Sequence, residues 1–305
     1  MEQAVDVVII GAGVAGMSAA VYASRAGLDT IMLDSGAPGG KLLKTNEISN
    51  WTGTPESSGV DLAMKMFDHS TKFGAKYAYG NVIKVIDGKE KQVICEDGTI
   101  YHTKAIIVAT GTKERLMGIK GEQEYIGKGI SYCAVCDAAF YRNREVVVIG
   151  GGNAALEEAV YLTQFADKVT IIMRRDVFRA EQIAIDAVMN HPKIEIMQNY
   201  QPIEILGDGK VVTGIKLRHT KTNEELEMPT SGVFPFIGAD PITDFLKDYD
   251  MMDEQGYLMV NEYMETKCDM IYGAGDVNHK VLRQVVTAAS DGAIAAQSAF
   301  HKIRG

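Results

Sequence analysis

Two cysteines at positions 133 and 136 are followed directly by an aspartate, in the stretch Ser-Tyr-Cys-Ala-Val-Cys-Asp. Thiols at this spacing can close a small ring disulfide and open it again, and a lowered thiol pKa with partial solvent access favours such exchange. We therefore take Cys133, Cys136 and Asp137 as the candidate catalytic residues of a redox centre. The alternative for Asp137 is a plain helix or loop cap.

The other two cysteines, Cys95 and Cys268, are isolated in strand-like surroundings. A tetrahedral zinc site usually needs a second close pair of ligands, and a structural disulfide framework is typical of secreted chains. We therefore expect both residues to be buried small hydrophobic side chains, and we expect no metal.

The 305-residue chain is acidic, with a formal net charge of -9. It has no basic patch of the kind that neutralises phosphates, so we expect no nucleic-acid partner. The first six residues include acids where a signal peptide has basic residues, and no apolar run approaches the roughly 20 residues of a membrane span. The composition predicts a cytoplasmic chain that does not enter the membrane, and the length predicts roughly two domains.

A glycine-rich loop with Gly11, Gly13 and Gly16 separates an apolar β-branched run from the helical stretch Met17–Ala26. In this motif the first glycine permits a tight turn, the second lets the backbone approach a pyrophosphate, and the third packs helix on strand. The next strand ends at Asp34, 18 residues past the last glycine, where a carboxylate would hold a ribose hydroxyl. We infer a dinucleotide-binding fold that accepts an unphosphorylated ribose.

The same pattern occurs again, with the loop Gly150–Gly152, an alanine at 155 in place of the last glycine, and a second strand ending at Met173. At the end of that strand stand Arg174 and Arg175, with Arg179 after a turn. Arginines suit a 2′-phosphate, so this second fold is predicted to bind NADPH. The alternative for the arginine pair is a solvated strand end.

Each half also contains short alternating segments. Residues 82–86, 92–95 and 99–103 predict a small antiparallel layer before the buried strand at 105–111. Residues 194–197, 202–206 and 211–218 predict a matching layer before the segment at 232–238. The chain therefore indicates an internal duplication of a nucleotide fold with a three-stranded insert.

The C-terminal part contains one strand, Met270–Gly273, and an alanine-rich helix, Val285–Ile303. These elements do not make a third fold, so we expect them to complete the first domain. The predicted fold class is α/β, with two Rossmann-like, three-layer ββα domains and the second, NADPH-binding domain inserted in the first. The predicted limits are 1–113 and 243–305 for the first domain and 114–242 for the NADPH domain. The crossing linkers are expected near 113–118 and 240–243.

The chain resembles low-molecular-weight, bacterial-type thioredoxin reductase over essentially its full length. The resemblance rests on the two glycine loops, the cysteine motif with its aspartate, the arginine set, and further short motifs: Gly39-Gly40, Ala109-Thr110-Gly111, Phe236-Ile237-Gly238, Gly275-Asp276 and Arg283 to Ala289. The glycine loops alone are shared by a broad class of flavoproteins, but the motifs together are specific.

The resemblance implies FAD in the first domain, NADPH in the second, and a homodimer. The FAD residues that it implies are Gly11, Gly13, Ala15, Gly16, Asp34, Ser35, Gly36, Gly39, Gly40, Lys41, Leu42, Asn50, Val82, Ala109, Thr110, Gly111, Gly275, Asp276, Arg283, Gln284 and Val285. The NADPH residues that it implies are Gly151, Gly152, Asn153, Ala154, Arg174, Arg175, Arg179, Ile237 and Gly238.

The sequence departs from the family pattern at a few positions. Lys41 replaces a usual Gln, Met173 a frequent His, Ala138 a usual Gly, Asp34 a usual Glu and Trp51 a usual Phe. None of these changes removes a redox group. Lys41 is the departure with the clearest potential to alter flavin contacts or the flavin potential.

The activity implied is NADPH-dependent reduction of the disulfide of thioredoxin. The resemblance implies that Cys136 faces the flavin, that Cys133 attacks the protein substrate, and that Asp137 protonates the departing thiolate. The cysteines precede the second glycine loop and so belong to the NADPH domain, whereas the flavin belongs to the other domain. We therefore expect two domain orientations during turnover.

Other functions remain open from the sequence. A flavin-dependent dithiol oxidase, or a reductase of another thioredoxin-like protein, would keep the cysteines, although an oxidase has no use for the arginines. A peroxiredoxin reductase of the fused type would carry an extra N-terminal domain, and a ferredoxin-type reductase would lack the cysteine pair. A redox sensor would hold FAD without turnover.

Overall fold

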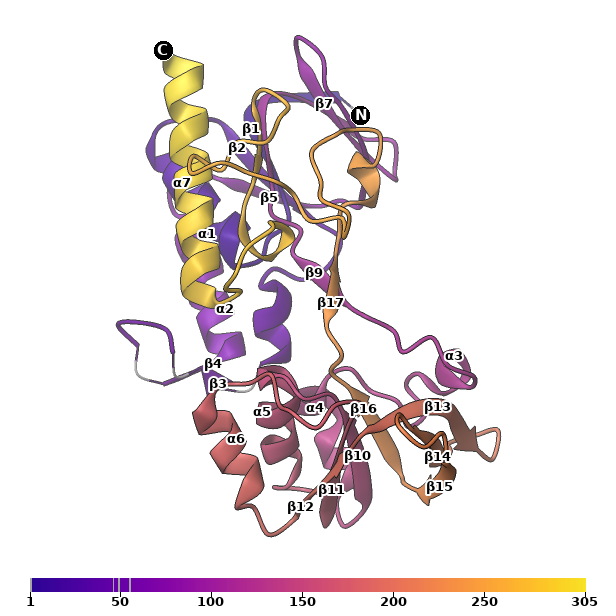
Figure 1. The fold of residues 1–305 in the computed structure, drawn as a ribbon. Coiled ribbons are helices and arrows are strands. Elements are labelled where there is room, and N and C mark those ends of the chain that lie inside the picture. The colour runs from indigo at the N-terminus through magenta and orange to yellow at the C-terminus, as the bar shows by residue number, and fades with distance from the viewer. Residues whose placement is uncertain (1, 46, 49, 55) are drawn as a thin grey trace. The chain divides into compact units, whose positions relative to one another are not determined.

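The computed structural model describes residues 2–45, 47–48, 50–54 and 56–305, with the side chains of Glu47, Val135 and Cys136 outside the described part. The chain divides into two compact units. Unit 1 comprises residues 1–113 and 240–305, and unit 2 comprises residues 114–239. In Figure 1 the indigo start and the yellow end of the chain belong to one unit, and the middle of the chain forms the other.

Unit 1 is built on a mixed sheet with strand order β5-β2-β1-β8-β7-β6, in which β18 also pairs with β8. Its strands are β1 (Glu2–Ile10), β2 (Thr30–Asp34), β5 (Lys76–Tyr79), β6 (Val82–Ile86), β7 (Lys91–Cys95), β8 (Ile100–Val108) and β18 (Ile271–Gly273), with a small β3 (Glu47–Ile48) and β4 (Ser57–Ser58) pair. Its helices are α1 (Val14–Arg25), α2 (Gly59–Thr71), α7 (Val285–Arg304) and the 3-10 turns η1 (Gly40–Lys44), η3 (Asp244–Leu246) and η4 (Gly275–Val277).

Strand β1 shows why this sheet has two buried faces. Its residues Val7 and Ile9 pack in one core cluster with α1 and α7, and Val8 and Ile10 pack in a second cluster on the other side. A continuous β-branched run is typical of a parallel strand that is covered on both faces. Figure 1 shows α7 alongside α1, and a Cβ at Gly292 of α7 would lie 2.1 Å from the carbonyl oxygen of Ala15.

The small antiparallel layer predicted for the first half is not separate from this sheet. The segments expected at 99–103 and 105–111 form a single strand, β8, which pairs with β1 along its whole length, from Ile100 to Val108. Its first part pairs antiparallel with β7 and its last part pairs parallel with β18. Because β1 continues alongside, the strand is not interrupted at Lys104, whose Nζ lies 2.7 Å from Asp6 Oδ1.

Unit 2 has a parallel sheet, a separate antiparallel sheet and helices. The parallel order is β12-β11-β10-β16, and the antiparallel order is β13-β14-β15. The strands are β10 (Glu145–Ile149), β11 (Lys168–Met173), β12 (Ile194–Gln198), β13 (Tyr200–Gly207), β14 (Val212–His219), β15 (Glu225–Pro229) and β16 (Gly232–Pro235). The helices are α3 (Glu122–Tyr125), α4 (Ala134–Asp137), α5 (Asn153–Leu162), α6 (Gln182–Met189) and the 3-10 turn η2 (Ala138–Tyr141).

The prediction that residues 194–197 form the first strand of a second antiparallel layer is wrong. Residues 194–197 belong to β12, which pairs parallel with β11 in the main sheet. The reason is helix α6, which crosses from β11 to β12 and so returns the chain in the parallel direction. The third antiparallel strand is instead β15, whose Leu226 and Met228 pack against the core beside β14. Their alternation with glutamates was a readable strand signal.

The chain passes between the units twice, and the two passages pair with each other. They are β9 (Thr112–Glu114) and β17 (Ala239–Pro241), which form a two-stranded sheet. Among the described residues, no helix has the length and apolar character that a bilayer crossing requires.

Candidate functional site

The first glycine loop fits a phosphate group. Gly11 has φ +108°, and a Cβ there would lie 2.3 Å from the carbonyl oxygen of Ala109. A Cβ at Gly16 would lie 1.9 Å from the carbonyl oxygen of Gly11, but a Cβ at Gly13 would meet nothing within 4 Å. Two glycines therefore permit close packing, and the third leaves an open cradle at the N-terminus of α1. Free backbone N–H groups and the helix dipole favour an anion there.

Asp34 ends β2 beside this loop. Its Oδ2 accepts the Ala12 N–H at 2.7 Å, and its Oδ1 accepts the Gly36 N–H at 2.9 Å. A carboxylate has about four acceptor sites, so each oxygen still has capacity for a ribose hydroxyl. Ser35 and Gly36 follow in an exposed turn, and the Tyr77 hydroxyl donates to the Gly36 carbonyl at 2.7 Å.

The Gly39-Gly40 segment folds back on the same loop. The Gly39 N–H donates to the Ala12 carbonyl at 2.8 Å, and a Cβ at Gly40 would lie 3.3 Å from Gly13 Cα. Lys41, the departure from the family pattern, donates from Nζ to Thr112 Oγ1 at 2.5 Å. Leu42 is buried in a cluster that Val285 also contacts.

Parallel pairing brings three distant loops to one edge of the sheet. The Ala109 N–H donates to the Ile10 carbonyl at 2.7 Å, so the Thr110-Gly111 turn at the end of β8 lies beside the first glycine loop. Strand β18 ends next to β8, and a Cβ at Gly275 would lie 2.8 Å from the Cβ of Ala15. This arrangement places the Gly275-Asp276 turn at the edge where ligands of parallel α/β sheets bind.

The start of α7 joins this group through side chains. Asn50 Nδ2 donates to Gln284 Oε1 at 3.0 Å, across 234 positions of sequence. Arg283 donates to the carbonyl oxygens of Asp276, at 3.3 Å, and Asn278, at 3.1 Å. Its guanidinium also lies 4.3 Å from the ring centroid of Tyr257. The structure therefore holds Arg283 and Gln284 against the Asp276 turn and the Asn50 loop.

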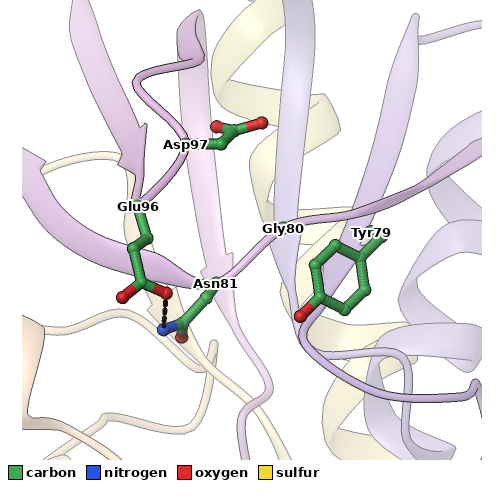
Figure 2. A pocket seen from close by; sticks show the side chains of 5 residues that line it. All are labelled: Tyr79, Gly80, Asn81, Glu96 and Asp97. Carbon is green, nitrogen blue, oxygen red and sulfur yellow. Dashed lines mark hydrogen bonds between the residues drawn. The ribbon is translucent and has the colours of Figure 1, made fainter.

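Val82 lies apart from that group, at the start of β6, where it pairs with Cys95. The segment before it begins beside Asp34, because the Gly80 N–H donates to the Asp34 carbonyl at 2.9 Å. A small pocket here is lined by Tyr79, Gly80, Asn81, Glu96 and Asp97, as Figure 2 shows. Its two carboxylates, one of them bonded to Asn81 Nδ2 at 2.9 Å, make it unsuitable for a phosphate.

The second glycine loop repeats this construction in unit 2. Gly150 has φ +143°, and a Cβ there would lie 2.3 Å from the carbonyl oxygen of Phe236. Gly152 precedes α5, whose first residues are Asn153 and Ala154. Ile237 and Gly238 follow β16, and Gly238 accepts the Arg115 N–H at 2.9 Å. The loop therefore presents a helix N-terminus at the edge of a parallel sheet, as in unit 1.

Two of the three arginines are exposed after β11, and the backbone of the third is hydrogen-bonded to the second glycine loop. Arg174 and Arg175 are exposed directly after β11. The Arg179 N–H donates to the Gly151 carbonyl at 2.7 Å, and Asn153 Oδ1 accepts the Glu181 N–H at 2.7 Å. These contacts bring the arginine segment back to the glycine loop, so cationic side chains flank a phosphate-binding backbone.

Cys133 stands just before α4 and is disulfide-bonded. Its N–H donates to Ser131 Oγ and its carbonyl accepts from the same hydroxyl, both at 3.1 Å. Asp137 ends α4, with its N–H bonded to the Cys133 carbonyl at 3.2 Å. The side chain of Cys136, also predicted for the redox centre, lies outside the described residues. The structure therefore places Cys133 and Asp137 on one turn of helix.

Three side chains near this turn, those of Glu122, Tyr132 and Tyr141, escaped the sequence prediction. Buried Glu122 accepts the hydroxyl of Tyr132, the neighbour of Cys133, at 2.5 Å and the N–H groups of Met117 and Gly118 at 2.7 Å. Burial and the Glu122 hydrogen bond raise the pKa of Tyr132. Burial, with the charge of Asp137, raises the pKa of Tyr141 to about 12. Of the two phenols, only Tyr132 donates a hydrogen bond from its hydroxyl to Glu122 among the residues that the structure describes, and no sequence signal distinguished Glu122 from a surface acid.

Glu158 on α5 is the other group that the sequence did not single out. Its Oε2 is buried and has no hydrogen-bond partner within the described part of the chain. Burial, with the charge of Glu157, raises its pKa to about 7. This carboxyl is therefore partly protonated near neutral pH.

The remaining cysteines are free thiols. Cys95 is buried, as predicted, and burial raises the pKa of its thiol to about 11. Cys268 is half-buried against the same core cluster, which is less burial than predicted. No group of metal-binding side chains occurs among the described residues.

Comparisons with known proteins agree along nearly the whole chain. The model of the pyridine nucleotide-disulphide oxidoreductase family matches residues 5–292. The thioredoxin reductase of Listeria innocua is 48% identical over 298 residues, 98% of this chain and 93% of that protein. The thioredoxin reductase of Bacillus subtilis is 46% identical over 302 residues, 99% of this chain and 96% of that protein. The crystal structure of Lactococcus lactis thioredoxin reductase matches with a TM-score of 0.96 at 43% identity, covering 98% of this chain and 99% of that chain.

Proposed function

The chain belongs to the pyridine nucleotide-disulphide oxidoreductase family, and we propose that it is an NADPH-dependent flavoenzyme that reduces the disulfide of thioredoxin. The observation that carries this proposal is the combination of two different nucleotide loops with disulfide-bonded Cys133 in a Cys-x-x-Cys-Asp motif. The near full-length likeness to thioredoxin reductases supports the protein substrate.

FAD is assigned to unit 1. The open cradle at Gly13 suits its pyrophosphate, Asp34 suits its adenosine ribose, and Asp276 with Arg283 suits the ribityl and ring side. When bound, FAD supplies the two-electron carrier between NADPH and the cysteine pair. The proposed domain limits are 1–113 and 243–305 for FAD and 114–242 for NADPH.

NADPH is assigned to unit 2. The N-terminus of α5 suits the pyrophosphate, and Arg174, Arg175 and Arg179 suit the 2′-phosphate. Arginine binds phosphate through paired charge-assisted hydrogen bonds, which a ribose hydroxyl cannot reproduce. The arginines therefore select NADPH over NADH.

The cysteines exchange their electrons with the partner by thiol chemistry. The reduced Cys133 thiolate attacks one sulfur of the thioredoxin disulfide, forms a mixed disulfide and releases the other partner sulfur as a thiolate, which takes a proton from Asp137. The Cys136 thiolate then attacks Cys133, re-forms the Cys133–Cys136 disulfide and releases the second partner thiolate, which is protonated from solvent. The partner gains two electrons from the two enzyme thiolates, which become a disulfide, and two protons, one from Asp137 and one from solvent.

Turnover also requires motion in our proposal. The cysteines belong to unit 2 and the FAD residues to unit 1, while NADPH, dithiol and flavin must react in pairs. One rigid arrangement cannot serve these steps, so the units reorient between half-reactions. A cross-link between the units should slow turnover and leave flavin content unchanged; unchanged turnover would contradict the motion.

The proposal also includes an oligomeric state and a cellular location. A homodimer follows from the family resemblance, and a sedimentation measurement tests it. A cytoplasmic location fits an NADPH-driven disulfide reductase, because the cytosol is kept reducing by such reactions.

The decisive experiment is anaerobic titration of the purified yellow protein with NADPH, followed by thioredoxin. We expect the flavin absorbance to bleach and then to recover with thioredoxin in the wild type. Cys133→Ser should bleach but not recover, and Asp137→Asn should recover more slowly. Bleaching by dithiols but not by NADPH, with recovery in oxygen, would instead identify a dithiol oxidase.

A further inference from the structure

A charged pair is buried next to the Gly275-Asp276 turn of unit 1. Lys280 Nζ lies 2.6 Å from Asp291 Oδ2, and their side chains are only 15% and 12% exposed. The same oxygen accepts the N–H of Gly275 at 2.9 Å. One carboxylate on α7 therefore binds both a lysine and the backbone of the turn.

Overall stability alone does not account for this pair. Removing two charges from water costs several kcal/mol per ion, and well-packed hydrophobic residues often replace such pairs without loss of stability. The backbone N–H of buried Gly275, however, requires an acceptor. A buried carboxylate that is neutralised by Lys280 provides that acceptor from a fixed direction.

The surroundings of Asp291 are rigid. Gly292, its neighbour, packs directly on the backbone of Ala15, and Ser18 Oγ donates to the Ala289 carbonyl at 2.6 Å. Helix α7 is thereby locked onto α1, the helix that begins at the first glycine loop. Gly275 has φ +84° and has no room for a Cβ against Ala15. Asp291 therefore fixes the position of the Gly275-Asp276 turn relative to the first glycine loop.

We propose that Asp291 and Lys280 are positioning residues for FAD. Asp291 sets the place of the Gly275-Asp276 turn relative to the pyrophosphate cradle, and Lys280 holds the Asp291 carboxylate in place through their 2.6 Å contact. The inference rests on the proposed function, because it takes Asp276 as a ligand of FAD. Neither residue belongs to the motifs that predicted the cofactor sites.

The test uses the flavin-free protein prepared from purified holoprotein, titrated with FAD and followed by flavin fluorescence. Lys280→Met and Asp291→Asn should each weaken FAD binding about tenfold, the effect of losing one hydrogen bond to a charged group. Lys267→Met is the matched control, since Lys267 pairs with Asp250 at the same 2.6 Å but the two side chains are 66% and 87% exposed. It should change FAD affinity less than about twofold.

The double variant Lys280→Met/Asp291→Leu separates positioning from folding. It leaves no unpaired buried charge, so the flavin-free protein should lose less stability than either single variant, and the remaining loss comes from the Gly275 N–H without an acceptor. Its FAD affinity should remain weakened, because the Gly275 N–H has no acceptor. If the single variants fail to fold, the FAD affinity of the double variant tests the positioning role.

Wild-type FAD affinity in the folded double variant would overturn the inference, since a merely structural pair would alter the unfolding temperature and not the affinity. Failure of the wild-type protein itself to bind FAD would refute the proposed function instead. The two failures are therefore distinguishable in the same titration.

Discussion

Units 1 and 2 contain the same kind of glycine loop, but they differ in whether its third motif position has room for a side-chain Cβ. In unit 1, Gly16 packs so closely that a Cβ would lie 1.9 Å from the carbonyl oxygen of Gly11. In unit 2, Ala155 occupies the matching place and is itself buried. Helix α5 therefore leaves room for a methyl group where α1 does not. A motif specifies the turn, but the local approach of helix and strand decides how strictly glycine is required.

The units also differ in the charged residue at the end of their second parallel strand and in the surroundings of a buried acid. Asp34 offers acceptors at the end of β2, whereas Arg174 offers donors at the end of β11. Asp291 in unit 1 is neutralised by Lys280, whereas Glu158 in unit 2 has a buried oxygen without a partner among the described residues. Two units of the same fold therefore carry opposite charges at the end of the second strand, and a few side chains account for the difference.

The largest effect is expected from exchanging glycine and alanine at the third position of the two glycine loops. Gly16→Ala should weaken FAD binding on the order of a hundredfold or more, because the new methyl group must displace the loop backbone. Ala155→Gly is the control and should cost only about 1 kcal/mol of stability through lower helix propensity. Flavin content and thermal unfolding of both purified variants check this. Equal flavin content in Gly16→Ala and wild type would contradict the steric argument.

The next effect concerns Glu158, the buried acid of unit 2. The pKa of Glu158 is raised from 4.5 to about 7 in the folded state, so the stability linked to its protonation is present below pH 4.5 and is lost as pH rises through 7. Glu158→Gln removes this loss and should stabilise the protein at pH 8 by up to about 3 kcal/mol.

Urea unfolding at pH 5 and pH 8 measures the Glu158 effect, since the gain from Glu158→Gln should fall to about 1 kcal/mol or less at pH 5. Asp208→Asn is a control with an exposed carboxyl in the same unit, whose pKa is lowered by the backbone N–H groups of Val211 and Lys210. It should not stabilise the protein at pH 8. A Glu158→Gln gain that is the same at both pH values would show that ionisation is not its cause.

A smaller effect concerns the strand ends that we propose to bind the ribose groups. Arg175→Ala should raise the KM for NADPH about tenfold, because a charge-assisted hydrogen bond to the 2′-phosphate is lost. The KM for NADH should hardly change, since NADH lacks that phosphate. Arg218→Ala, an exposed arginine of the same unit paired with Glu225, serves as control and should leave both constants unchanged. A parallel rise for both nucleotides would remove the arginine from this role.

The smallest effect is expected at Lys41 of unit 1. Lys41→Gln restores the usual family residue and removes the 2.5 Å contact to Thr112. Because the lysine is exposed, stability should change by less than about 0.5 kcal/mol and FAD affinity by less than about threefold. FAD titration and the flavin midpoint potential, compared with those of Lys44→Gln in the same turn, check this. A tenfold change in affinity would make Lys41 a principal contact.

The sequence by itself determined the elements whose rules are local. Strand, glycine loop and helix follow one another within about 20 residues, so the loop and strand-end positions of Gly11, Asp34 and Gly150 could be predicted from spacing alone. The cysteine motif is equally local, because Cys133 and Asp137 lie on one turn. The alternation that marked most strands required no knowledge of their partners.

Only the tertiary structure decided which distant residues meet. Strand β12 joined the parallel sheet because α6 returns the chain in that direction, and β8 became one strand because β1 runs beside it. Asn50 reaches Gln284, and Gly275 shares one oxygen of Asp291 with Lys280, through register and helix packing. Such contacts depend on the relative placement of whole elements, to within fractions of an ångström, and short-range sequence patterns carry no information about that placement.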